Sequence, residues 1–220
     1  MWGNCFLCID KSVKITCIDY MIRITKNMLD DSAKVLSGAF GDDPLFKFFF
    51  PGDSTRCNLA FFTFRFIAAH ACSKGFVFAA SPSFEGVSIW LHSQVLERGI
   101  IDQLRFGALK MYSHQGKEII KRQVDASSYM KSIHAEILPG RHIYLSTIGI
   151  DKQHRGRGIA SVLMAPGLEI ADRGNMPCYL DTHNEQNLGL YRRYGFNVVH
   201  EGVIPGSNVR HWAMIRRSQR

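Results

Sequence analysis

The sequence predicts an α+β (α/β) fold, in which a mixed, mostly antiparallel central sheet of about six or seven strands is flanked by helices. Two apolar segments, 76–80 and 86–91, are separated by turn residues, which predicts an antiparallel hairpin. Several longer segments carry apolar residues at helical spacing. From Arg141 onward, segments typical of strands alternate with segments typical of helices, as expected for a sheet covered by helices.

The first third of the chain predicts one strand followed by three helices. Residues 20–24 alternate between apolar and polar side chains, which indicates a strand with one buried face. Residues 25–40 show helical spacing, with acidic residues near the start and Gly41 as a stop signal. A short aromatic helix over 45–50 and a long apolar helix over 56–73 follow, each preceded by a proline-containing break.

The segment after the hairpin, 100–138, is mostly helical in pattern. We expect interruptions near Gly116 and at 125–128, and Pro139-Gly140 ends the segment. The remaining elements predicted in order are a strand over 142–150, a helix over 158–173, a strand over 178–182, a helix over 187–194 and a final strand over 209–215. Pro166 lies inside the first of these helices and removes a backbone hydrogen bond, so we expect a kink there that leaves the preceding loop intact.

Length and composition fit one globular domain. The chain has 220 residues, of which 46% are hydrophobic, and this suffices for one substantial core. We expect a single domain over 20–220 and a poorly ordered extension at 1–19, which could stem from an upstream start because Met21 opens the first strand. Lys47 and Arg65 interrupt the densest apolar runs, so no membrane-spanning helix is predicted.

Cysteine usage and the N-terminus predict a cytoplasmic protein. The six cysteines are sparse and irregularly spaced, so we expect free thiols in a reducing compartment. Lys11 and Lys14 interrupt the stretch where a signal peptide would carry its apolar core. Cys5-x-x-Cys8 with Cys17 lacks a fourth ligand at a recognised spacing, so no metal site is predicted.

The formal net charge of +8 is compatible with nucleic acid, an acidic membrane surface or a polyanionic small molecule as the partner. Most basic residues are scattered, whereas Arg155 with Arg157 and Arg192 with Arg193 lie beside the motifs described next. A phosphate-rich cofactor is therefore expected, and neither nucleic acid nor membrane. A basic nucleic-acid-binding module is the non-enzymatic alternative, although the chain lacks a basic face interleaved with aromatic residues.

The strongest chemical motif is a glycine-rich turn between the strand over 142–150 and the helix after it, Arg155-Gly156-Arg157-Gly158-Ile159-Ala160. Backbone amides at a helix start have no partner within the helix and lie at the positive end of its dipole, so they bind anions. Gly156 and Gly158 allow a diphosphate to approach the backbone closely. A plain strand-to-helix turn with a surface basic pair is the alternative.

Two ordered motifs carry a family resemblance. Ile148-Gly149-Ile150 followed by Arg155-x-x-Gly158-x-Ala160 resembles the central motif of the Gcn5-related N-acetyltransferase (GNAT) superfamily. Leu180-Asp181-Thr182-x-Asn184, followed by Leu190-Tyr191-Arg192-Arg193-Tyr194-Gly195-Phe196, resembles that superfamily's next motif. The resemblance extends over residues 20–216 and is densest in the last third. Weaker matches are similar to the branch that includes puromycin acetyltransferase: Phe40-x-x-Asp43-Pro44, Trp90 in its strand, and His134 before His142-x-Tyr144-Leu145.

The resemblance implies a GNAT-like sheet in which the strand ending at Ile150 splays from the next strand in a V, with the pantetheine arm of acetyl-CoA in the gap. Backbone groups of the strand would hold pantetheine, amides from Gly156 to Ser161 would hold the pyrophosphate, and Asn184 would contact the cofactor. Asn187 instead could cap the helix that it begins. The implied cofactor-binding residues are Ile148, Gly149, Ile150, Arg155, Gly156, Arg157, Gly158, Ile159, Ala160, Ser161, Asn184 and Asn187.

Tyr191 matches the superfamily's proton donor to the leaving thiolate, and a phenol is protonated at neutral pH. The alternative is a core aromatic residue on an apolar helix face, which is the role we expect for Tyr194. The sequence does not identify the general base. The candidates are His134 and the strand residues His142, Tyr144, Ser146 and Thr147.

The implied activity is an acyltransferase that moves the acetyl group of acetyl-CoA directly to a primary amine of a small molecule. Aromatic walls with one carboxylate suit a cationic amine, and Asp43, Phe46, Phe49 and Trp90 could line such a pocket or simply belong to the core. A protein or peptide N-acetyltransferase is the enzymatic alternative, but such enzymes need an open groove that the segment 100–138 could close. We expect a monomer or a homodimer, and the sequence does not identify the acceptor.

Overall fold

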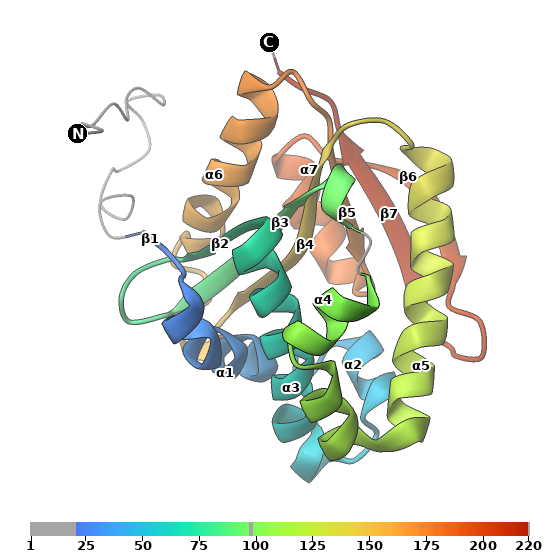
Figure 1. Cartoon of the computed structure of the whole chain (residues 1–220). Helices are drawn as coiled ribbons and strands as arrows, with labels where there is room; N and C mark the ends of the chain where they lie inside the picture. Colours follow the sequence, from blue (N-terminus) through green and yellow to red (C-terminus); the bar gives the residue numbers. More distant parts are fainter. Residues whose placement is uncertain (1–20, 97–98, 220) are drawn as a thin grey trace.

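The computed structural model describes residues 21–96 and 99–219 (Figure 1). The predicted extension at 1–19 lies outside these residues, and a single domain over 20–220 stays a prediction. Within the described residues the centre is a seven-stranded sheet in the order β1-β2-β3-β4-β5-β7-β6. The strands are β1 (Ile22–Arg23), β2 (Gly75–Ala79), β3 (Gly86–His92), β4 (Ile143–Ile150), β5 (Cys178–Thr182), β6 (Asn197–Val203) and β7 (Arg210–Arg216).

Neighbouring strands pair antiparallel except β4 and β5, which pair parallel. The prediction of a mixed, mostly antiparallel sheet flanked by helices is therefore confirmed. A parallel pair needs a crossover connection, and here a helix supplies it. The helices of the described residues are α1 (Leu29–Ala39), α2 (Pro44–Phe49), α3 (Asp53–Lys74), α4 (Ile100–Arg105), α5 (Ala108–Ile137), α6 (Ile159–Arg173) and α7 (Leu188–Arg193).

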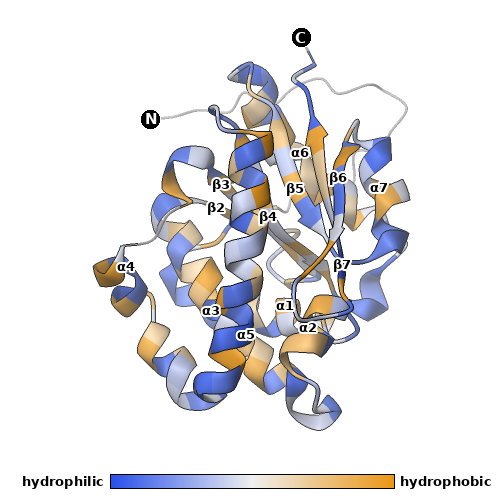
Figure 2. Cartoon of the chain, turned by 90° about the vertical axis from the view of Figure 1, so that its right-hand side faces the viewer, coloured by the Kyte–Doolittle hydropathy of each residue, from blue (hydrophilic) through white to orange (hydrophobic). Residues whose placement is uncertain are grey.

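The core has two halves, one on each face of the sheet. Successive strand residues point to opposite faces, so Ile89 and Leu91 pack with α1 and α3, whereas Trp90 between them packs with α6 and α7. Helix α5 covers the first face farther along the sheet, and Figure 2 shows hydrophilic residues along much of its visible side. Every helix in the described residues is too short or too polar to span a bilayer.

Three details of the predicted elements are corrected. Strand β6 was not predicted, because this edge strand is only half-buried, with Val199 and Val203 exposed, and its alternation is weak. The interruption near Gly116 is confirmed by its φ of 75°. The interruption at 125–128 is wrong, since α5 continues through it, and the additional break lies at Gly107, with a φ of 102°.

Pro166 does not divide α6, which runs as one helix from Ile159 to Arg173. The adjacent Gly167 faces Trp90, and a Cβ at this glycine would lie 2.2 Å from the indole ring. The Ser88 hydroxyl donates to the Leu163 carbonyl at 3.0 Å and accepts from the Trp90 indole at 3.1 Å. The middle of α6, where the kink was predicted, therefore packs closely against the sheet, and the kink itself stays a prediction.

Candidate functional site

A V-shaped gap opens between β4 and β5. The two strands pair only from Ile143 with Cys178 to Leu145 with Leu180. Beyond that point β4 stays paired with β3, and β5 stays paired with β7. The register between β3 and β4 shifts so that Ser146 is an extra residue, a bulge that increases local twist. The predicted splay is thus confirmed, and it begins at this bulge.

Past the bulge, the second edge of β4 has no strand beside it among the described residues. Ile148 and Ile150, which we predicted to hold pantetheine through their backbone, lie on this open edge, where an extended ligand could add as a strand. Gly149 also has a packing role, because a Cβ there would lie 2.8 Å from Leu36 of α1. Its glycine identity is explained by this helix contact.

The glycine loop between β4 and α6 has the geometry of an anion site. Gly156 and Gly158 have φ values of 78° and 80°, the left-handed region that favours glycine, and open space surrounds both Cα atoms. Within the described residues, no acceptor is recorded for the amides from Gly156 to Ala160. The Ser161 amide already donates to the Gly158 carbonyl at 3.0 Å. The predicted run of available amides therefore ends one residue earlier than expected, at Ala160.

The two arginines of the loop differ in their contacts. Arg155 donates to the backbone carbonyls of Ile150 at 3.2 Å and Ala39 at 2.9 Å, so it ties the loop to β4 and α1. Arg157 is exposed and has no recorded partner in the described part of the chain. Arg157 is consequently the arginine placed to add positive charge beside the amides.

The two asparagines after β5 differ from our expectation in which of them caps a helical turn. The Asn184 side chain accepts from the Gln186 amide at 3.1 Å and thereby caps the 3-10 turn Glu185–Asn187. Asn187 makes no side-chain cap at the start of α7 and instead donates to the Thr182 hydroxyl at 3.4 Å. The prediction that Asn187 caps the helix is wrong, and cofactor contact by either residue stays a prediction.

Tyr191 lies on α7 and is buried, with its ring 6.2 Å from that of Phe196. Burial is the main cause that raises its pKa, and the charge of Asp43 adds to the effect, so the phenol keeps its proton at neutral pH. Tyr194 packs at the core margin, and its hydroxyl contacts that of Ser161 at 2.9 Å.

Asp43 combines a structural role with an available carboxylate oxygen. Its Oδ1 accepts from the amides of Leu45 and Phe46 at 2.9 and 3.3 Å and caps α2. No donor to Oδ2 is recorded in the described part of the chain. Burial raises the pKa of this carboxyl to about 6, although the two capping amides oppose the shift. A carboxyl whose pKa lies near neutrality next to a buried tyrosine is a candidate acid or base.

A cleft of about 550 Å³ is lined by Asn184 and by Pro44, the residue after Asp43. Its walls are the start of α2, the loop between β5 and α7, and the turn between β6 and β7. The lining residues are Pro44, Lys47, Phe48, His183, Asn184, Glu185, Asn208, Val209, Arg210 and Trp212. None of the four residues predicted to line a pocket lines it: Asp43 is absent from its walls, and Phe46, Phe49 and Trp90 are buried in the core.

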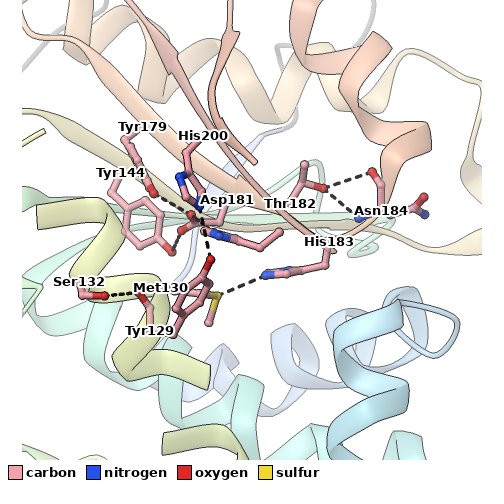
Figure 3. A network of polar contacts seen from close by, with 11 residues as sticks. Tyr129, Met130, Ser132, Tyr144, Tyr179, Asp181, Thr182, His183, Asn184 and His200 are labelled. Carbon is pink, nitrogen blue, oxygen red and sulfur yellow. Dashed lines mark hydrogen bonds and ion pairs between the residues drawn. The ribbon is translucent and has the colours of Figure 1, made fainter. Parts of the chain in front are cut away.

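A buried polar network centred on Asp181 closes the end of β5 (Figure 3). The carboxylate accepts from Tyr144 at 3.2 Å, Tyr179 at 2.7 Å and the His211 ring at 2.8 Å. These donors come from β4, β5 and β7, so one side chain ties together three strands at the mouth of the splay. The side chains of α5 reach the same region, where Met130 contacts the His183 ring at 3.2 Å.

His134 and His142 form a pair of their own. Their Nε2 atoms are 2.7 Å apart, and His142 Nδ1 lies 2.7 Å from the Gly140 carbonyl. A carbonyl only accepts, so Nδ1 of His142 carries the hydrogen, and His134 Nε2 must donate to His142 Nε2. Burial lowers the pKa of both rings, that of His134 to about 4. Both are therefore neutral at pH 7, and each has a structural partner.

Sequence reasoning missed Asp43 as an acid–base group and Asp181 as the centre of a network. The alternation of Tyr179 and Asp181 in β5 was the available signal, because residues two apart share a face of a strand. No spacing in the sequence links them to His211 or to α5.

Comparisons with known proteins agree with this geometry. Residues 122–196 match the model of the Acetyltransferase (GNAT) family. An uncharacterised N-acetyltransferase of Schizosaccharomyces pombe is 23% identical over 180 residues, which cover 79% of this chain and 72% of that protein.

Two solved structures share the fold. A histone acetyltransferase HPA2 and related acetyltransferase of Corynebacterium glutamicum superposes with a TM-score of 0.63 and 22% identity, covering 91% of this chain and 97% of that one. Arylalkylamine N-acetyltransferase 2 of Aedes aegypti superposes with a TM-score of 0.59 and 15% identity, covering 90% and 98%. At these identities the likeness concerns the arrangement of the sheet and helices.

Proposed function

We propose that this chain is an acetyltransferase of the GNAT superfamily and that it transfers the acetyl group of acetyl-CoA directly to a primary amine of a small molecule. The observation that carries the proposal is the continuous path formed by the open edge of β4 and the amides from Gly156 to Ala160. An extended pantetheine fits the open edge, and a diphosphate fits amides at a helix start. Arg157 adds charge there.

The acid–base chemistry is assigned to Asp43 and Tyr191. The amine nitrogen attacks the thioester carbonyl carbon, the carbon–sulfur bond breaks, and the acetyl group forms a new bond to nitrogen. Asp43 Oδ2 takes the proton that the amine loses, and the Tyr191 phenol gives one to the departing thiolate. One proton is gained and one is lost, so the pair as a whole keeps its charge.

The cleft lined by Pro44 and Asn184 is proposed to hold the acceptor. Its volume of about 550 Å³ lies in the range of small-molecule sites, which supports a small amine over a protein segment. The arylalkylamine enzyme that shares the fold acts on small amines by its name, whereas the histone acetyltransferase is named for a protein acceptor. Placement near the puromycin acetyltransferase branch belongs to the same proposal and rests on Phe40-x-x-Asp43-Pro44. A cytoplasmic location and a monomeric or homodimeric state stay predictions.

Calorimetry with acetyl-CoA, followed by a panel of amines and peptides assayed for free thiol release, tests the proposal. We expect binding of acetyl-CoA and faster turnover with small primary amines than with peptides. Turnover of peptides alone would favour the protein acetyltransferase alternative. Strongly salt-dependent DNA binding without affinity for acetyl-CoA would favour a nucleic-acid-binding module.

A further inference from the structure

We propose that the acceptor amine carries an anionic group, a carboxylate or a phosphate, at its far end, and that Lys47 and Arg122 bind this group. The inference rests on the proposed function, because it extends the acceptor cleft described above. It concerns the class of small molecule that this cleft selects.

The geometry comes from a second cleft that adjoins the first. It has a volume of about 480 Å³ and shares Lys47 and Phe48 with the acceptor cleft. Helix α2 forms one wall of both clefts, and the turn between β6 and β7 forms another. The first cleft reaches the β5–α7 loop, and the second reaches Arg122 on α5. The lining residues of the second cleft are Lys47, Phe48, Pro51, Arg122, Asp125, Pro205 and Gly206.

The charged side chains that line the two clefts leave an excess of positive charge at Lys47 and Arg122. Asp125 is paired with Lys121 at 2.6 Å, and Glu185 is paired at 2.8 Å with Arg210, which Glu201 also contacts, so each acid that lines the clefts already has a cationic partner. Within the described residues, Lys47 and Arg122 make no ion pair with an acidic side chain. Two cations without an ion-pair partner in one concave surface favour an anion, and the charge of Lys47 also acts on the nearby carboxyls of Asp42 and Asp43.

The surface between the proposed amine end and the two cations is mostly apolar. Phe48, Pro51 and Pro205 line the second cleft and offer surface to a hydrocarbon linker, but no charge. The complementary ligand therefore has a primary amine, an apolar spacer and a terminal anion. A diamine fits less well, because its second ammonium group would lie next to Lys47 and Arg122. The protein's net charge of +8 acts in the same direction on the encounter rate.

Matched acceptors test the inference directly. Hexylamine, aminohexanoate, aminohexyl phosphate and diaminohexane share one reactive amine and one spacer and differ at the far end. We expect the KM for aminohexanoate or aminohexyl phosphate to be about ten-fold below that for hexylamine, as one charge-assisted hydrogen bond implies. The better of the two anionic acceptors identifies the group as carboxylate or phosphate. Diaminohexane is expected to have the highest KM.

Variants assign the effect to the two cations. Lys47→Met and Arg122→Met should each raise the KM for the anionic acceptors about ten-fold, and Arg122→Met, which lies outside the acceptor cleft, should leave kcat and the hexylamine KM unchanged. Lys131→Met is the matched control, since Lys131 is an exposed lysine of α5 that lines neither cleft. Both cations lie at the surface or half-buried, so thermal unfolding should be unaffected.

Separate outcomes decide the inference and the function. Turnover of hexylamine and aminohexanoate with equal KM, or equal effects of the two variants on both acceptors, overturns the anion site and leaves the acetyltransferase standing. Turnover of none of the amines removes the proposed function itself. Calorimetric titration of aminohexanoate into the protein saturated with CoA then still reports on the cations, because loss of binding in Arg122→Met does not depend on chemistry.

Discussion

The proposed donor and acceptor sites differ in which parts of the chain form them. On the donor side, between β4 and α6, the proposed contacts come from main-chain groups, and the special features are two glycines with positive φ and a strand pair that separates after Leu145. On the acceptor side, α2, α5 and the β6–β7 turn supply side chains from distant parts of the sequence. The backbone site tolerates few residue types, whereas the side-chain site can change with little cost to the fold.

The largest loss of activity is expected from a substitution of Asp43, the proposed base for the acceptor amine. Asp43→Asn should lower kcat/KM by about a hundred-fold or more, because an amide cannot take the amine proton. Asparagine caps helices about as well as aspartate, so α2 should stay folded. Asp43→Ala is the complementary variant, which loses the cap as well. Activity of Asp43→Asn near the wild-type level would exclude Asp43 as the base.

The pH dependence follows from the same carboxyl. Its pKa is raised to about 6, so the wild-type kcat/KM should fall as the pH drops through that value, and Asp43→Asn should lack this limb. Folding stability changes with pH in the opposite direction to kcat/KM. Folding favours the protonated form, so its stabilisation is present below about pH 4 and is lost as the pH rises to about 6. Asp43→Asn should therefore be at least as stable as wild type at neutral pH.

The second prediction tests whether Tyr191 gives a proton to the departing thiolate when the acetyl group passes from donor to acceptor. Tyr191→Phe should lower kcat about a hundred-fold and leave the dissociation constant of acetyl-CoA unchanged, because only the proton donor is removed. The ring keeps its place against Phe196. Stopped-flow thiol release combined with calorimetry separates the two quantities. Unchanged turnover would leave Tyr191 as a packing residue, the alternative that its burial also permits.

The contrast between a main-chain site and a side-chain site also explains which features the sequence could predict. Gly156 and Gly158 were identified because a close approach to the backbone requires glycine, and the splay followed from the family resemblance at Ile150. Asp181 was quoted in a motif, but its network depends on His211, which only the sheet order brings near. Strand β6 was missed because an exposed edge strand leaves a weak hydrophobic pattern.

The third prediction concerns a substitution that should weaken binding of acetyl-CoA without affecting the acceptor site. Gly158→Ala places a Cβ at a φ of 80°, which costs about 1–2 kcal/mol or relaxes the loop. Affinity for acetyl-CoA should fall about five- to thirty-fold by calorimetry, with kcat at saturation little changed. Gly38→Ala is the control, since this α1 glycine has open space and ordinary helical φ. Equal affinity in both variants would argue against amide binding at the loop.

The smallest expected effect separates two asparagines at the junction of the two sides. Asn184 caps the turn after β5 and lines the acceptor cleft, so Asn184→Ala should cost about 1 kcal/mol and lower the Tm by about 2–4 °C. Asn187→Ala loses only one contact of 3.4 Å to Thr182 and should change the Tm by less. Both substitutions remove the same side chain a few residues apart, so differential scanning calorimetry compares them directly. A larger loss at Asn187 would return the capping role to that residue, and with it the original prediction for the start of α7.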